Sequence, residues 1–188
     1  MARPEAVHLH DGDLRWRSVP MPGANRGIDV VPLASAQGRT TMVARFPAGF
    51  ERATPGGYLA AEEVVLLDGF LELEGVRYGA GSWLHIPAGF RRTEMRSADG
   101  ATALAWFGGA VDFLTPEELP EVVDPITSRD LGSLAVGASW QTPESTWRLG
   151  TAADRGQDEE YLDVQGAGWA RAATVVADSD RLLFRTPR

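Results

Sequence analysis

Three side chains in the middle of the chain, Glu62, His85 and Arg92, have the types that proton transfer and anion binding require. A carboxylate or an imidazole moves protons in general acid–base chemistry, and a guanidinium binds carboxylate or carbonyl groups. Histidine is the usual proton shuttle near neutral pH, and the chain has only 3 histidines. Side chains of these types can support acid–base or anion-binding chemistry if the fold brings them together.

Glycine and proline flank these residues at a regular spacing, which forms two motifs. The first motif comprises Gly49, Glu62 and Gly69, and the second comprises Gly81, Pro87, Gly89, Arg92 and Arg96. Together they resemble the two sequence motifs of the cupin superfamily. The resemblance implies a small jelly-roll β-barrel in which Glu62 and Arg92 face the interior from adjacent strands.

The resemblance stops at the metal ligands. Cupins usually hold a transition metal through two histidines and the glutamate of the first motif and a histidine of the second. Here the first two positions fall on Pro55 and Gly57 or, in a register with a shorter gap, on Gly56 and Tyr58. Arg92 stands at the third histidine position, so only Glu62 of the ligand set is present. We therefore expect no bound metal and no cofactor.

Two roles are open for Glu62 and Arg92. A carboxylate inside an apolar barrel needs a compensating cation, which Arg92 supplies. The two residues then form a buried ion pair that fills the space of a metal. Alternatively, Arg92 anchors an anionic or carbonyl group of a substrate while Glu62 moves a proton.

Further candidates surround the pair. Tyr58 supplies a hydroxyl at a ligand position, and Glu94 follows Arg92 on the same face, where it either shares the pocket or pairs with Arg92. Trp83 and Trp106 are expected to line an apolar cavity or to be core residues. Because strands alternate, Trp83 and His85 share one face, and the sequence leaves open whether that face is inward.

Composition excludes several functions. A net charge of -8 and a pI near 4.9 disfavour nucleic-acid and anionic-membrane partners. The absence of cysteine and lysine excludes disulfides, thiolate nucleophiles and lysine Schiff bases. No window approaches the roughly 20 apolar residues of a membrane span, so we expect a cytoplasmic location. His8 and His10 lie on one face of an expected strand, but no third imidazole accompanies them.

Short β-type segments separated by glycine, proline and aspartate predict an all-β fold with three parts. Residues 1–27 form an N-terminal arm with a strand near Val7, and residues 28–114 form the barrel from short β-type segments. Asp68-Gly69 predicts a hairpin, and Glu74-Gly75 predicts the next turn. Residues 115–188 begin with a short helix at the capping box of Thr115 and Glu118, which Pro120 limits to little more than a turn. They continue as strands that form a degenerate second barrel half, extend the barrel or pack on a partner.

We expect a metal-independent enzyme that acts on a small organic molecule by acid–base chemistry, of the isomerase, cyclase or dehydratase type. A non-catalytic barrel that binds or senses a small molecule is the alternative. A metal-dependent dioxygenase with ligands such as Glu62, His85 and Glu94 is the second alternative. Since cupin barrels commonly pair through sheet edges, a homodimer is expected.

Overall fold

The computed structural model of the chain describes residues 5–9, 12, 14–36, 38–121, 124–154, 156, 159–165, 168–171 and 180–188. These residues form two compact units. The barrel unit comprises Arg15–Arg129, and the C-terminal unit comprises Asp130–Arg188 together with Met1–Leu14. This division differs from the expected boundaries at residues 27 and 114, because the second half of the arm and residues 115–129 fall in the barrel unit.

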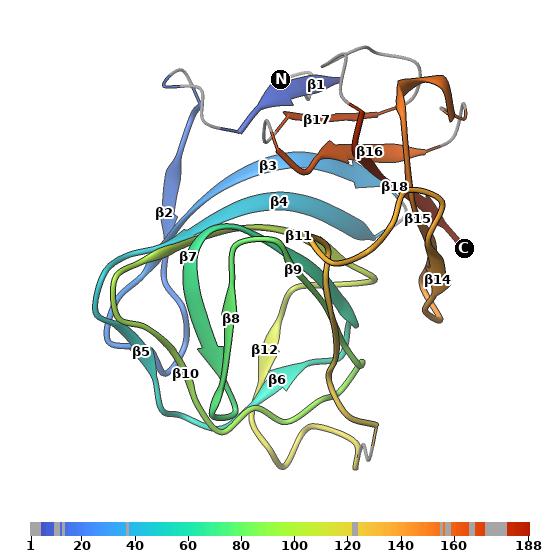
Figure 1. The fold of residues 1–188 in the computed structure, drawn as a ribbon. Helices are drawn as coiled ribbons and strands as arrows, with labels where there is room; N and C mark the ends of the chain where they lie inside the picture. The colour runs from blue at the N-terminus through green and yellow to red at the C-terminus, as the bar shows by residue number, and fades with distance from the viewer. Residues whose placement is uncertain are drawn as a thin grey trace. The chain divides into compact units, whose positions relative to one another are not determined.

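The barrel unit contains one large, strongly curved sheet, which Figure 1 shows closing around an interior. The backbone of the sheet follows the order β13-β9-β7-β11-β4-β3-β2, while β8 and β10 pair with the far half of β7, and β5 pairs with β10. The strand bounds are β2 Arg17–Val19, β3 Ile28–Ala36, β4 Arg39–Phe46, β5 Phe50–Arg52, β7 Glu62–Leu73, β8 Val76–Gly79, β9 Ser82–Ile86, β10 Met95–Ser97, β11 Ala101–Phe107 and β13 Thr127–Asp130. A separate short ladder joins β6 (Gly57–Tyr58) to β12 (Phe113–Leu114).

The long strand β7 changes partners at Gly69. Its first half pairs with β9 and β11, and its second half pairs with β8 and β10. Gly69 has a φ of 70°, and a Cβ atom there would lie 2.1 Å from the Gly100 carbonyl oxygen. Asp68-Gly69 is therefore a bend inside one strand, not the hairpin expected from the sequence. The turn at Glu74-Gly75 does form, with positive φ at both residues, as a hairpin with a two-residue loop requires.

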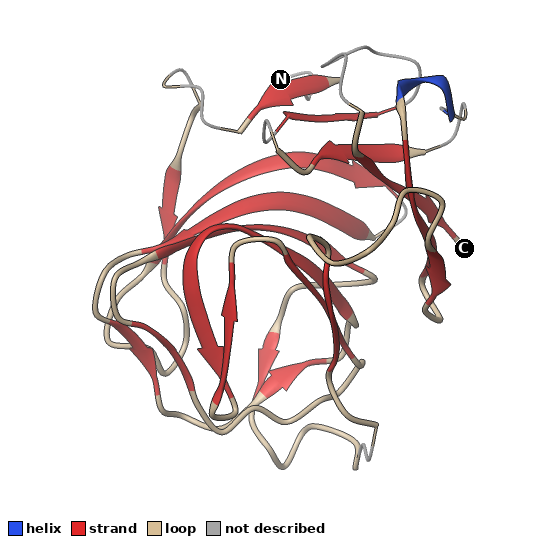
Figure 2. Cartoon of the chain, viewed as in Figure 1, coloured by secondary structure: helices blue, strands red, loops and turns tan. Residues whose placement is uncertain are grey.

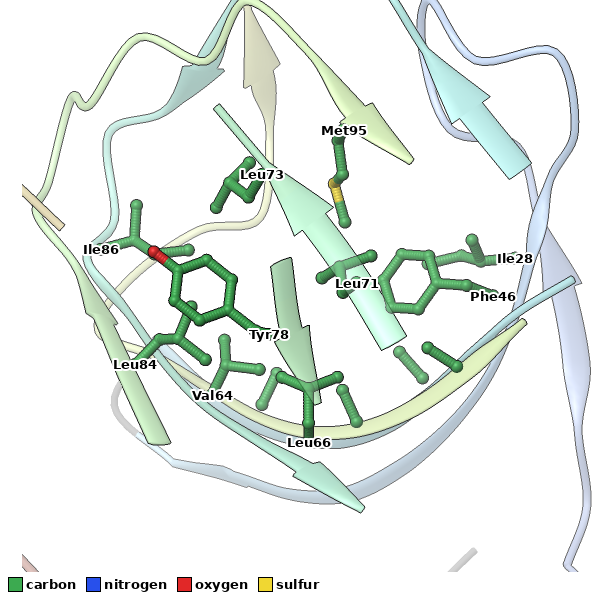
Figure 3. Close-up of a cluster of buried hydrophobic side chains, with 14 of the residues drawn as sticks. Ile28, Phe46, Val64, Leu66, Leu71, Leu73, Tyr78, Leu84, Ile86 and Met95 are labelled. Carbon is green, nitrogen blue, oxygen red and sulfur yellow. The ribbon is translucent and has the colours of Figure 1, made fainter. Parts of the chain in front are cut away.

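Apolar side chains from the inward-facing positions fill much of the barrel. Figure 3 shows Val64 and Leu66 of β7 beside Leu84 and Ile86 of β9, and all four are buried. The opposite face of these strands is buried as well, since Glu63 and Val65 are each only 1% exposed. Strands buried on both faces lose the polar–apolar alternation that normally reveals which face is inward.

The C-terminal unit is a second sheet with the strand order β1-β17-β16-β18-β15-β14. Its strands are β1 Ala6–His8, β14 Ser139–Gln141, β15 Ser145–Gly150, β16 Glu160–Asp163, β17 Gly168–Arg171 and β18 Leu182–Pro187. Tyr161 and Phe184 lie in its core, with ring centroids 6.1 Å apart. The N-terminal strand expected near Val7 forms and is the edge strand of this sheet.

The described residues contain no α-helix, so the all-β prediction is confirmed (Figure 2). A single 3₁₀ turn, η1 at Ala152–Asp154, is present. The short helix expected at Thr115 does not form, and residues 116–118 make the turn to which Pro120 was expected to limit it. Thr115 and Glu118 do make the predicted capping contact, in which the Thr115 N–H donates to the Glu118 carboxylate at 2.9 Å, but Pro120 follows too closely for a helix to continue. None of the described residues lies in a helix long and apolar enough to cross a membrane.

Candidate functional site

The barrel encloses a cavity of about 480 Å³, a size that suits a small organic molecule. Apolar side chains make up most of its wall. They come from several strands and include Ile28, Val30, Met42, Ala44, Phe46, Val64, Leu71, Leu73, Leu84, Ile86, Met95, Ala103, Ala105 and Phe107. The polar residues of the wall are Arg17, Tyr58, Glu62 and Asp112. The cavity is thus an apolar chamber with few polar groups.

Tyr58 and Glu62 form the buried polar part of this wall. Tyr58 is the second residue of β6, and its ring makes edge contacts with Phe107 and Phe113 at centroid distances of 5.7 Å. Glu62 is the first residue of β7 and is 5% exposed. Both side chains therefore present oxygen atoms to an otherwise apolar space.

Arg92 is held against these two residues by its backbone. Its N–H donates to the Gly56 carbonyl at 2.8 Å and its carbonyl accepts from the Gly56 N–H at 3.0 Å, so the loop after β9 is fixed beside β6. The guanidinium forms an ion pair with the Glu62 carboxylate and lies 5.1 Å from the Tyr58 ring centroid. Arg92 is 3% exposed. Both readings of the sequence expected this juxtaposition, and the structure brings the pair together.

A second buried arginine, Arg52, lies at the same end of the barrel. It ends the short strand β5, in which Phe50 and Arg52 are buried and Glu51 is exposed. The Arg52 guanidinium stacks on the Phe113 ring at 4.5 Å, and only 1% of the residue is exposed. The sequence analysis missed Arg52. The period-two alternation of Phe50, Glu51 and Arg52 was the available signal, because it places Arg52 on the same face of the strand as the apolar Phe50.

The two guanidiniums influence each other. The pKa of Arg92 is lowered to about 10, mainly by burial; the interaction with Tyr58 raises it, and the positive charge of Arg52 lowers it. Burial also lowers the pKa of Arg52, while the Tyr58 hydroxyl and the Glu74 carboxylate raise it. Both guanidiniums are charged at neutral pH. The polar end of the barrel therefore holds two buried cations and one buried carboxylate.

His85, Trp83 and Trp106 do not line the cavity, so of the alternatives left open by the sequence the structure has the outward face for His85 and the core position for the two tryptophans. The neighbours of His85 on β9, Leu84 and Ile86, line the cavity, so Trp83 and His85 are on the opposite face of the strand. On β11, Ala105 and Phe107 line the cavity, and Trp106 between them faces the other way. These three side chains are buried away from the cavity, which removes His85 as a proton shuttle there.

The remaining candidates also lie apart from the cavity. Glu94 is partly exposed, forms an ion pair with Arg96 and is not part of the cavity wall. It therefore neither shares the pocket nor pairs with Arg92. His8 is exposed on β1 of the C-terminal unit, and His10 lies outside the described residues.

The residues at the cupin ligand positions do not fit a metal ion. Tyr58 lines the cavity, which favours the register that places the two histidine positions at Gly56 and Tyr58. A Cβ atom at Gly56 would lie 2.4 Å from the Leu114 carbonyl oxygen, so no imidazole has room there. In the other register, a Cβ atom at Gly57 would lie 2.2 Å from the Phe90 carbonyl oxygen.

The charges at the site also disfavour a metal ion. The one carboxylate, Glu62, is already paired with a guanidinium, and two guanidinium charges oppose a divalent cation. Within the described part of the chain, no group of three or more His, Asp or Glu side chains is arranged to hold a metal. The residues at these positions thus differ from the ligands of a metal-binding cupin in the room available for a side chain and in charge.

Comparison with known protein families assigns the barrel. Residues 4–111 match the family described as the ChrR cupin-like domain. The chain belongs to this cupin family. The match covers the barrel strands through β11, so the resemblance inferred from the two motifs is confirmed.

Solved structures show the same fold at low sequence identity. A dioxygenase candidate from Nostoc punctiforme is 16% identical, with a TM-score of 0.64, over 92% of this chain and 77% of its own. The protein Ylba from E. coli is 11% identical, with a TM-score of 0.50, over 91% of this chain and 82% of its own. No protein among the curated sequences matches the chain. These structures share the cupin fold with the chain, and at such low identity they carry no information about its chemistry.

Proposed function

We propose that the barrel is a metal-independent binding site for a small, mostly apolar organic molecule. The observation that carries the proposal is the cavity of about 480 Å³, whose apolar wall ends in Tyr58 and in the Glu62–Arg92 ion pair. Apolar pockets with a few convergent polar groups are typical ligand sites. The apolar wall supplies affinity through burial of the ligand, and the polar end orients one functional group.

Binding without turnover fits the geometry better than acid–base catalysis does. A general base must be free to take a proton, and the Glu62 carboxylate is engaged by Arg92. His85 does not reach the cavity, so Tyr58 is the other group of the buried polar end that could exchange a proton with a ligand. The function best supported is therefore small-molecule binding or sensing.

An acid–base enzyme on the same site is the second candidate. It is favoured by the presence of both a hydroxyl and a carboxylate on the cavity wall, at Tyr58 and Glu62. In that case Arg92 would hold a carbonyl or anionic substrate group while one of the two oxygens exchanges a proton. Turnover of a bound molecule that is lost in Tyr58→Phe, with binding retained, would establish this function.

A neutral fluorescent probe tests the binding function. N-phenyl-1-naphthylamine should bind the purified protein with enhanced fluorescence, because it fills an apolar chamber without needing a charged partner. The variants Ala103→Leu and Ala105→Leu add bulk to the cavity wall and should abolish the enhancement while the protein stays folded.

The matched control is Ala61→Leu, at a buried alanine that does not line the cavity. This variant should lose stability by overpacking, by about 1–3 kcal/mol, and should still bind the probe as long as it is folded. Absence of probe binding by the wild-type protein, or equal binding by the two cavity variants, would contradict the proposed function.

A further inference from the structure

The buried polar end of the barrel has an excess of positive charge. Arg52 and Arg92 are 1% and 3% exposed, whereas the carboxylate in an ion pair at this end is Glu62, which is bound to Arg92. An isolated buried charge is costly unless a partner compensates it. Because Glu62 is paired with Arg92, the unbalanced cation is Arg52.

Two of the three guanidinium nitrogens of Arg52 lack a hydrogen-bond acceptor. Its Nη1 and Nη2 atoms are buried and make no hydrogen bond with any residue that the structure describes. Buried guanidinium nitrogens are normally satisfied, so two orphaned donors on one side chain are unusual.

The nearest carboxylate outside the buried pair, that of Glu74, does not remove this deficit. Its oxygens accept hydrogen bonds from the Thr93 N–H at 2.6 Å, the Thr93 hydroxyl at 2.7 Å and the Glu94 N–H at 3.0 Å. Glu74 therefore raises the pKa of Arg52 from a distance, while its oxygens are occupied at the edge of the barrel.

The orphaned donors lie next to the cavity. Arg52 stacks on Phe113 and interacts with the Tyr58 hydroxyl, and both of these rings line the cavity. Phe113 is half-buried, and its ring contacts both Arg52 and Tyr58. Arg52 itself does not line the cavity, so a ligand group at the polar end reaches it by displacing one of these rings.

We propose that the ligand of this barrel is an amphipathic monocarboxylic acid, whose carboxylate binds Arg52 and the Tyr58 hydroxyl while its apolar body fills the cavity. This inference rests on the proposed binding function and names the class of its ligand. One negative charge makes the buried cluster of Arg52, Arg92 and Glu62 neutral, whereas a dianion would leave it negative. A planar carboxylate also matches the two donors of a guanidinium fork.

Competition against the neutral probe tests the inference. Octanoate and octanamide have the same apolar body and nearly the same shape, and they differ in charge. We expect octanoate to displace N-phenyl-1-naphthylamine from the wild-type protein at concentrations about 10- to 100-fold lower than octanamide, as a charge-assisted hydrogen bond predicts. Acetate, which lacks the apolar body, should not displace the probe.

Three variants locate the effect. Arg52→Met should reduce the preference for octanoate over octanamide to less than about twofold, and Arg52→Lys should keep part of it, because the ammonium retains the charge but not the fork. Arg77→Met, at an exposed arginine of β8, should leave the preference unchanged. Circular dichroism confirms that each variant is folded before it is compared.

The outcomes separate this inference from the function on which it rests. If the probe does not bind at all, the proposed function fails. If the probe binds but octanoate and octanamide compete equally in the wild-type protein, binding stands and the carboxylate inference is overturned. A preference for octanoate that survives Arg52→Met also overturns it.

Discussion

Arginine side chains in the two units differ in how far neighbouring groups compensate their charge. In the C-terminal unit, Arg148 contacts Glu159 at 2.8 Å, Arg185 lies 3.8 Å from Glu160, and Arg181 donates to the Leu134 carbonyl at 2.7 Å. In the barrel unit, Arg92 has Glu62, but Arg52 has two buried nitrogens without a hydrogen bond to any described residue. Among the described residues, Arg52 is the arginine with two such nitrogens, whereas Arg92 and, in the C-terminal unit, Arg171 have one each. Arg52 contacts a ring that lines the cavity.

The difference between paired and unpaired arginines indicates where a ligand binds. Structural ion pairs in the C-terminal sheet join two side chains of the same chain and need nothing further. A buried cation with open donors beside an apolar chamber instead has the features of a recognition site, in which a few polar groups are held ready by a rigid frame. Compensated and uncompensated arginines should differ in how much their replacement changes the free energy of unfolding.

The largest effect is expected at the compensated arginine of the barrel. Arg92→Met should lower the free energy of unfolding by about 3–5 kcal/mol, because it leaves the Glu62 carboxylate buried without a partner. The double variant Glu62→Leu with Arg92→Met should recover most of this loss. Urea denaturation followed by tryptophan fluorescence measures both.

The exposed Arg96 provides the control for this prediction, since it pairs with Glu94 at the surface. Arg96→Met should leave the denaturation midpoint unchanged. A single variant Arg92→Met as stable as the wild-type protein would show that the pair is solvated and does not stabilise the barrel.

In the C-terminal unit, Arg185→Met should cost less, about 1–3 kcal/mol. Arg185 is buried, but its partner Glu160 also accepts a hydrogen bond from the Trp169 indole N–H at 3.0 Å and is partly exposed. The carboxylate therefore keeps one partner after the substitution. Thermal unfolding of this variant beside Arg92→Met checks the order of the two effects, and a larger loss for Arg185→Met would break the comparison.

A restored imidazole should not turn the polar end into a metal site. Gly56→His pushes a Cβ atom against the Leu114 carbonyl, so the variant should lose about 1–3 kcal/mol of stability through overpacking. Elemental analysis after incubation with zinc or iron should show no increase in bound metal over the wild-type protein. Stoichiometric metal that depends on both the new histidine and Glu62 would contradict the spatial and electrostatic argument.

The sequence predicted the barrel because its signals are local. Short β-type runs, the turn at Glu74-Gly75 and the spacing of Gly81, Pro87 and Gly89 are properties of neighbouring residues, and the barrel that they predicted is present. The capping signal at Thr115 is also local, and with Pro120 so close it produces a turn and no helix. The expected homodimer stays a prediction.

The site was less predictable because its residues depend on which face of a strand is inward. The run Ser82–Ile86 is buried at all but its first position, so no polar face marked His85 as lying outside the cavity. Arg52 was missed for the opposite reason. An arginine on a three-residue strand normally indicates solvent, and only the pairing of β5 with β10 buries it beside Phe113.

The most direct test of the account is the stability of Arg52→Met in the absence of any ligand. If Arg52 is an uncompensated buried cation reserved for an anion, its replacement by an apolar side chain of similar length should leave the free energy of unfolding unchanged or raise it. A urea denaturation curve of the variant beside the wild-type protein measures this difference. A loss of more than about 1 kcal/mol would show that the fold itself compensates the Arg52 charge, and would contradict the assignment of this end of the barrel to a carboxylate.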